Sequence, residues 1–174
     1  MPSTTVQYYA LQVKTGGEQK FLKLAEQQLD SAFERLLWPR RKLRIRKKGK
    51  MRDVESAIFP GYLFLETDEL RDRTYRALRR TNGFYQFLPE NSRIEPLGGR
   101  DLELIRHFLG FGEVLDKSKV YFDENSRIRV LHGALKGLEG SIVKVDKRKR
   151  RAKVQLSLYE NSFLIDFGFD LLEP

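Results

Sequence analysis

Cysteine is absent from the 174 residues of the chain, and histidine occurs only twice. Without cysteine the chain forms no disulfide, no thiolate zinc site and no cysteine nucleophile. The two histidines, His107 and His132, have no partner at metal-ligand spacing, so we expect no metal site and no cofactor. No apolar run reaches the roughly 18 residues of a membrane span, and the N-terminus lacks a secretory signal pattern. We therefore expect a soluble, cytoplasmic protein that does not bind membranes.

Patterns that would support catalysis are weak. The segment TGGEQK, residues 15–20, has the glycines of a phosphate loop but lacks the Gly-Lys-Ser/Thr element that such a loop needs. Asp101 and Glu103 flank one residue of a predicted helix, so their carboxylates diverge and form a poor metal clamp. We therefore expect no catalytic residues and no enzyme. The alternative is a basic nuclease, which metal-dependent cleavage of labelled RNA or DNA would reveal.

Positive charge is abundant and concentrated. The chain has 33 Lys and Arg against 24 Asp and Glu, a formal net charge of +9. Counterion release rewards each phosphate that a basic protein neutralises, so nucleic acid is the leading candidate for a partner, ahead of an anionic membrane surface. Residues 40–52 include nine basic residues and no acidic one, and six of the seven residues 147–153 are basic. The alternative for each run is a solvated hairpin without a partner.

The first 110 residues alternate strand and helix patterns. YYALQV is apolar on both alternating faces, as in the central strand of a sheet, and the proline of AIFPGYLFLE favours a strand entry. The order of patterns predicts a ferredoxin-like α/β sandwich over residues 1–110, with residues 40–52 as an exposed basic β-hairpin arm. Strands are predicted at 8–13, 36–41, 62–66 and 84–88, and helices at 18–29, 68–80 and 101–109.

The remaining chain changes character twice. Residues 111–124 have four acidic and two basic residues and no clear periodicity, which predicts a flexible linker. Residues 125–174 contain only short strand patterns, at 127–133, 141–146, 152–158 and 162–167, with turn residues at each break. Closing these strands into a small SH3-like β-barrel would remove exposed edges, so the whole chain is predicted to be α+β with two domains.

Two sets of residues resemble a known family. YYALQVKTGGE and the motif Phe59-Pro60-Gly61-Tyr62 are similar to the N-terminal (NGN) domain of the NusG transcription elongation factors. The pattern Val130, Gly133, Leu135, Gly140, Ile142 resembles their C-terminal KOW domain, where the two glycines, Gly133 and Gly140, are structural. A KOW match alone is weak because ribosomal proteins share it. The two domains in this order cover nearly the whole chain.

The resemblance implies partners for the first domain. It would bind the clamp helices of RNA polymerase as a monomer and suppress pausing. Phe59 and Tyr62 would be exposed aromatic anchors of that contact, with core packing of both rings as the alternative. The arm would position nucleic acid, including DNA in the polymerase cleft, through phosphates. The implied polymerase-binding residues are Tyr8, Phe59, Pro60, Gly61 and Tyr62, and the implied arm contacts are Arg40, Arg41, Lys42, Arg44, Arg46, Lys47, Lys48 and Lys50.

The KOW domain departs from the housekeeping members of the family. Those members bind Rho or a small-subunit ribosomal protein through a loop with the pattern Ile-Phe-Gly-Arg, whereas this chain has Leu158-Tyr159-Glu160-Asn161. Loss of the glycine and arginine argues against either contact. The basic run is similar to the LoaP subgroup of specialised paralogs, processive antiterminators whose KOW domain binds an RNA hairpin in the nascent leader transcript. The implied RNA-binding residues are Lys144, Lys147, Arg148, Lys149, Arg150, Arg151 and Lys153.

Two alternatives remain at this point. One is a housekeeping NusG-type factor whose KOW domain binds Rho or a ribosomal protein. The other is a structural rRNA-binding or ribosome-assembly protein, which explains the charge but not the separate α/β domain with its FPGY motif. Co-purification with polymerase subunits or with ribosomal particles would separate these classes.

Overall fold

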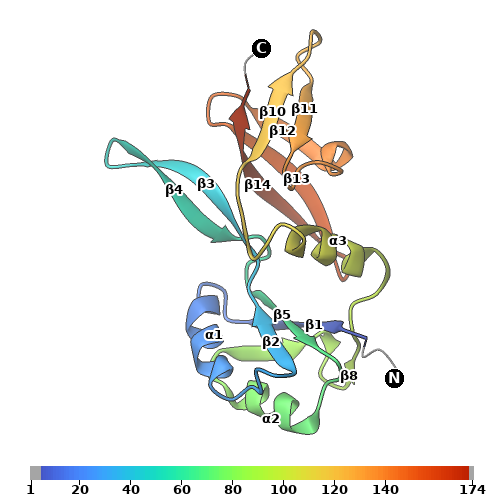
Figure 1. Cartoon of the computed structure of the whole chain (residues 1–174). Helices are drawn as coiled ribbons and strands as arrows, with labels where there is room; N and C mark the ends of the chain where they lie inside the picture. The colour runs from blue at the N-terminus through green and yellow to red at the C-terminus, as the bar shows by residue number, and fades with distance from the viewer. Residues whose placement is uncertain (1–4, 173–174) are drawn as a thin grey trace. The chain divides into compact units, whose positions relative to one another are not determined.

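The computed structural model describes residues 5–172 and contains two compact units (Figure 1). The first unit comprises the chain up to Trp38 together with Phe59–Glu103, and the second comprises Pro39–Ile58 together with the chain from Leu104 onward. The predicted boundaries, 1–110, 111–124 and 125–174, differ from this division because residues 39–58 and 104–124 both group with the C-terminal strands. Within residues 5–172, no helix is long and apolar enough to cross a membrane.

The first unit is a ferredoxin-like α/β sandwich. Its four strands lie in the order β2-β5-β1-β6, and β5 and β1 are antiparallel neighbours at the centre. The helices α1 and α2 each follow one strand and precede the next, as predicted. The elements are β1 (Gln7–Val13), α1 (Glu18–Glu26), β2 (Glu34–Leu37), β5 (Tyr62–Thr67), α2 (Asp72–Arg80), β6 (Phe84–Phe87), β7 (Pro89–Glu90), β8 (Arg93–Ile94) and the start of α3 (Gly99–Leu109).

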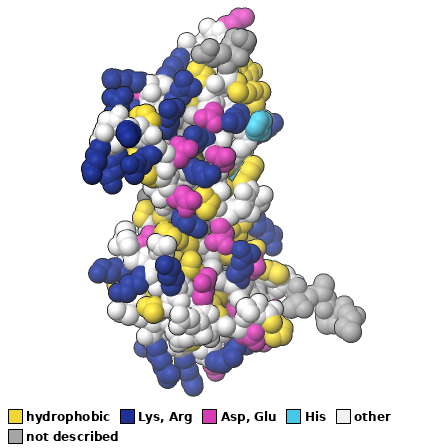
Figure 2. Space-filling model, turned by 60° about the vertical axis from the view of Figure 1, so that its left-hand side comes forward, with side chains coloured by type: hydrophobic (Ala, Val, Ile, Leu, Met, Phe, Trp, Pro, Cys, Tyr) yellow, Lys and Arg dark blue, Asp and Glu magenta, His cyan; other side chains and the backbone are white. Residues whose placement is uncertain are grey.

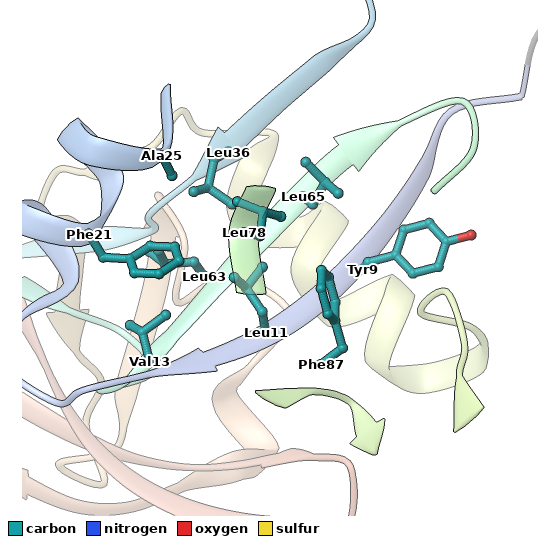
Figure 3. Packing of buried hydrophobic residues seen from close by; sticks show 10 residues of the cluster. All are labelled: Tyr9, Leu11, Val13, Phe21, Ala25, Leu36, Leu63, Leu65, Leu78 and Phe87. Atoms are coloured by element: carbon teal, nitrogen blue, oxygen red, sulfur yellow. The ribbon is translucent and has the colours of Figure 1, made fainter. Parts of the chain in front are cut away.

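The core of the first unit follows from the strand periodicity. Alternate residues of β1 and β5 point to one face, where α1 and α2 supply their apolar side chains (Figure 3). The opposite face of β1 and β5 is also buried, which is why YYALQV is apolar at both alternating positions. The cluster consists of Tyr9, Leu11, Val13, Phe21, Ala25, Leu36, Leu63, Leu65, Leu78 and Phe87.

The second unit contains a five-stranded sheet in the order β11-β10-β14-β13-β12. Alternate residues of β13 are buried, so RAKVQLSL has one apolar and one polar face, as the sequence predicts. The arm adds β3 and β4, and β9 pairs in parallel with β3. The elements are β3 (Arg40–Lys47), β4 (Lys50–Ala57), β9 (Val114–Leu115), β10 (Ser118–Phe122), β11 (Ile128–His132), the 3-10 helix η1 (Glu139–Ser141), β12 (Ile142–Asp146), β13 (Arg151–Leu158) and β14 (Asn161–Leu171).

The segment 111–124 is not the structureless linker that its composition suggests. It contains β9 and β10, and β10 pairs with β11 on one side and with β14 on the other. Ser118 and Val120 are buried, and Lys119 forms an ion pair with Asp170 at 2.6 Å. SKVYF has no regular alternation of polar and apolar residues, so its strand structure follows from pairing with β11 and β14 and not from local periodicity.

The two KOW glycines differ in their surroundings. Gly133 has a φ of +110°, and a Cβ there would lie 2.6 Å from the Cα of Ser118. Only glycine fits this position without moving the backbone of β10. Gly140 lies in η1 without a positive φ, and a Cβ added there would have no heavy atom within 4 Å. The geometry therefore requires glycine at 133 and not at 140.

Candidate nucleic-acid interface

The arm is a regular antiparallel hairpin. Its register runs from Arg40 opposite Ala57 to Lys47 opposite Lys50, and the two turn residues Lys48 and Gly49 have φ values of 51° and 77°. Two consecutive positive φ angles produce the tight turn whose twist suits a hairpin. The outer half of the arm exposes its cations, and contact with phosphates requires this exposure. The exposed cations are Arg44, Arg46, Lys47, Lys48, Lys50 and Arg52.

Arg41 is buried, so its side chain is not exposed for the predicted nucleic-acid contact. Its Nε donates to the carbonyl of Asp166 and its Nη1 to the carbonyl of Ala57, both at 2.6 Å. The guanidinium also lies over the ring of Phe167, 5.8 Å from its centroid. Burial lowers the pKa of Arg41 to about 10, so it stays charged at neutral pH. The alternation of β3 turns this one cation inward, where it fastens the arm to β14.

The side chains of Arg40 and Lys42, on either side of Arg41, are only partly exposed for contact with nucleic acid. Arg40 forms a salt bridge with Glu55 at 2.8 Å, and Lys42 is half-buried. Both remain predicted contacts, but the exposed cations nearer the turn are better placed for a large polyanion.

The basic turn of the β-domain connects β12 to β13. The carboxylate of Asp146 accepts a hydrogen bond from the backbone N–H of Lys149 at 2.9 Å, which lowers the pKa of Asp146 and orders the turn. Four of the predicted cations are exposed: Lys144, Lys147, Arg148 and Lys149. The ammonium of Lys147 lies 4.2 Å from the centroid of the Phe122 ring. Three cations of the turn itself therefore face solvent with a fixed backbone beneath them.

The other three predicted cations, Arg150, Arg151 and Lys153, are half-buried. Arg151 donates from Nη2 to the backbone carbonyl of Arg44 at 3.2 Å, and its Nη1 lies 3.8 Å from a carboxylate oxygen of Asp166. Arg151 thus has a structural role, since it links β13 to the arm.

The structure brings the two basic runs together. Residues of both runs line one cleft of about 510 Å³ in the second unit. Figure 2 shows Lys and Arg side chains crowded on the upper left of the molecule. Pattern reasoning treated the runs as separate sites because they lie about a hundred residues apart, and no local signal links them. The lining residues are Arg44, Ile45, Arg46, Met51, Arg148, Lys149 and Arg151.

The FPGY motif forms a buried turn. Phe59 and Tyr62 are 1% and 5% exposed, and the Phe59 ring packs edge-on against Phe64 with centroids 6.0 Å apart. The N–H of Tyr62 donates to the carbonyl of Phe59, and Gly61 between them has a φ of +84°. The expectation of exposed aromatic anchors is therefore wrong, because the turn folds both rings inward. Pro60 is exposed.

Tyr8 lies on β1 and is half-buried. Its hydroxyl donates to the carboxylate of Glu66 on β5 at 2.9 Å. The side chain is therefore held in one orientation at the sheet. Its contact with polymerase stays a prediction.

Residues 5–172 hold no group of three or more His, Asp or Glu side chains able to bind a metal ion. His107 donates from Nε2 to the carbonyl of Ala134 at 2.6 Å and packs against the rings of Phe108 and Phe111. His132 lies opposite Lys119 in the β10–β11 ladder. His107 therefore has the surroundings of a packed structural histidine, whereas His132 is exposed.

A ferredoxin-like sheet followed by a small β domain with a basic hairpin defines a two-domain α+β protein. The family model described as "Transcription termination factor nusG" matches residues 6–106. The chain belongs to the NusG family.

Individual relatives are similar over nearly the whole chain. The "Transcription termination/antitermination protein NusG" of Thermus thermophilus is 24% identical over 180 residues, covering 95% of this chain and 96% of the relative. The protein of the same name from Haemophilus influenzae is 26% identical over 174 residues, covering 95% and 92%. The solved structure titled "Domain interaction in Thermotoga maritima NusG" aligns with a TM-score of 0.61 at 20% identity, over 94% of each chain, and has the same fold.

Proposed function

We propose that this NusG-family protein is a processive antiterminator that binds RNA polymerase through its first domain and a hairpin of the nascent leader transcript through its basic β12–β13 turn. The observation that carries the proposal is the turn itself. Lys147, Arg148 and Lys149 are exposed on a backbone that Asp146 holds in place. Such a rigid turn presents several cations to the phosphates of an RNA stem without a large entropic cost.

The polymerase contact rests on the family and on the FPGY turn. In this proposal Tyr8, Pro60 and Gly61 form part of the docking surface, while Phe59 and Tyr62 shape it from below. Pro60 is the exposed residue of the motif. The tip of the arm would contact nucleic acid, including DNA in the polymerase cleft, through Lys47, Lys48 and Lys50. We propose that the protein acts as a monomer in the cytoplasm.

The β13–β14 turn argues against a housekeeping role. Leu158 is fully buried, and Tyr159 and Glu160 occupy the two turn positions with φ values of 49° and 65°. The family's glycine would suit a positive φ, and its arginine would offer a charge-assisted contact to a protein partner. This chain has neither residue there. The cations of the β12–β13 turn, at the other end of β13, support RNA as the partner instead.

The test is RNA binding by the full chain. Affinity for a structured RNA from the leader upstream of its own operon should fall steeply as salt rises from 50 to 200 mM, and Arg148→Ala with Lys149→Ala should weaken binding by about tenfold and reduce the salt slope by about 1 to 2. The matched control is Lys20→Ala with Lys23→Ala, which removes two exposed cations from α1. Salt-independent affinity, no affinity for leader RNA, or equal losses in both double variants would overturn the proposal.

A further inference from the structure

We infer that the arm and the basic β12–β13 turn form the two walls of a single groove that binds one segment of RNA phosphate backbone. This inference rests on the proposed function and deepens it, because it assigns the RNA site to both basic runs. Among the residues of the arm, the inference assigns the RNA contacts to Arg44 and Arg46. The tip cations Lys47 and Lys50 lie outside the cleft lining.

Hydrogen bonds fix the spacing of the two walls. Arg151, at the start of β13, donates to the backbone carbonyl of Arg44 at 3.2 Å. Deeper in the unit, buried Arg41 donates to the carbonyl of Asp166 on β14 at 2.6 Å. Both bonds join the arm to the strands that carry the turn. The walls therefore belong to one preorganised surface, which lowers the entropic cost of binding.

The cleft between the walls is cationic. Five of its seven described lining residues are Arg or Lys, two from the arm and three from the turn and β13, and none of the seven is acidic. Like charges so close to one another repel, and an anion between them removes this repulsion. A volume of about 510 Å³ accommodates a group of nucleotide size. The residues Asp146 and Asp166 line an adjoining hollow, which shares Lys149 and Arg151 with the cleft.

The apolar part of the cleft lining suits a nucleic acid better than a small inorganic anion. Ile45 and Met51 also line the cleft, and Met51 is 46% exposed. A ribose or an unstacked base can pack on such surface while the guanidinium groups bind the flanking phosphates. Structured RNA offers unstacked bases at loops and bulges, whereas a regular DNA duplex does not.

A comparison of charge-matched variants tests the groove. We measure the affinity of the full chain for the leader hairpin after Arg44→Gln with Arg46→Gln, after Lys47→Gln with Lys50→Gln, after Arg148→Gln with Lys149→Gln, and after combining the first and third pairs. Each pair removes two exposed cations and leaves backbone hydrogen bonds, including the one at Arg44, in place. A DNA duplex of the same sequence is measured alongside.

The groove predicts that the Arg44/Arg46 pair weakens RNA binding by about tenfold and the tip pair by less than about threefold. The combined variant should lose less than the product of the two individual losses, because a segment released from one wall also leaves the other. Equal losses for the Arg44/Arg46 pair and the tip pair, or DNA binding as tight as RNA binding, would overturn the groove. A loss confined to Arg148 and Lys149 would overturn it too, yet leave the proposed function standing. Absence of RNA binding by the unaltered chain would overturn both.

Discussion

The guanidinium of Arg41 and the backbone carbonyl of Asp166 are joined by a hydrogen bond of 2.6 Å. The bond connects the arm to β14 across 125 residues of sequence, and Arg41 is 8% exposed. A residue that the family resemblance implies as a nucleic-acid contact is thus part of the interior of the second unit. The cations of one basic run therefore have different roles, because some are exposed and Arg41 is buried.

Replacing Arg41 by Ala should destabilise the second unit by about 1–3 kcal/mol, because the carbonyls of Asp166 and Ala57 lose their buried donor. The measurement is the urea midpoint of the full chain followed by circular dichroism. Arg46→Ala, on the exposed outer half of the arm, is the matched control and should change the midpoint little. Equal midpoints for the two variants would contradict the structural role of Arg41.

The two KOW glycines should respond differently to alanine. Gly133→Ala should destabilise the protein by about 1–2 kcal/mol from its positive φ alone, and by more because the Cβ meets the backbone of Ser118. Gly140→Ala meets no atom within 4 Å and should be nearly neutral. Thermal melting of both variants under one buffer compares them directly. An unchanged melting temperature for Gly133→Ala would contradict the requirement for glycine, because it would mean that the backbone around residue 133 moves away from Ser118 at no cost.

Acid should weaken the β10–β11 turn through Asp123. Its carboxylate accepts from the backbone N–H groups of Arg127 and Asn125 and from Nε of Arg129, and these bonds lower its pKa below the ordinary 3.8. A lowered folded-state pKa stabilises the fold above about pH 4 and loses this contribution as the pH falls further. The difference in urea midpoint between the unaltered chain and Asp123→Ala should therefore shrink between pH 7 and pH 2.5.

The exposed neighbour Glu124 provides the control for this pH dependence. Glu124→Ala should keep the acid sensitivity of the unaltered chain. If the difference in urea midpoint between the unaltered chain and Asp123→Ala stayed constant across the pH range, the Asp123 carboxylate would be excluded as the source of the acid sensitivity.

If the FPGY turn is buried, truncating Phe59 should lower the free energy of unfolding. If Phe59 were an exposed anchor, the same change would leave that free energy unaltered. Phe59→Ala should cost about 3–5 kcal/mol of unfolding free energy, because the cavity left beside Phe64 closes only in part. Pro60→Ala, at the exposed residue of the motif, should cost little. Differential scanning calorimetry of both variants distinguishes a buried Phe59 from an exposed one. An unchanged melting temperature for Phe59→Ala would contradict the buried position and favour an exposed anchor.

Periodicity predicted most of the strands and helices, because β13 buries one face and the central strands β1 and β5 bury both. The apolar faces of β1 and β5 and the alternation of RAKVQLSL appear in the structure as expected. The error at residues 111–124 arose because SKVYF shows no alternation of polar and apolar residues. Its pairing with β11 and β14, which both lie later in the sequence, decides its structure.

Parts of the candidate site could not be predicted from sequence. Local patterns placed Arg148 and Lys149 on a turn and Arg44 and Arg46 on an arm, but tertiary contacts alone bring the two pairs to one cleft. The inward direction of Arg41 also depends on the partner strand, since alternation fixes two faces without saying which is buried.

The central claim is antitermination directed by a leader RNA, and multi-round transcription across an intrinsic terminator tests it most directly. The template carries the leader found upstream of the protein's own operon, and a second template carries a scrambled leader. We predict that the protein raises terminator read-through only on the first template, that Arg148→Ala with Lys149→Ala abolishes the effect, and that Lys20→Ala with Lys23→Ala retains it. Unchanged read-through on the leader template, or the same increase on both templates, would contradict the account.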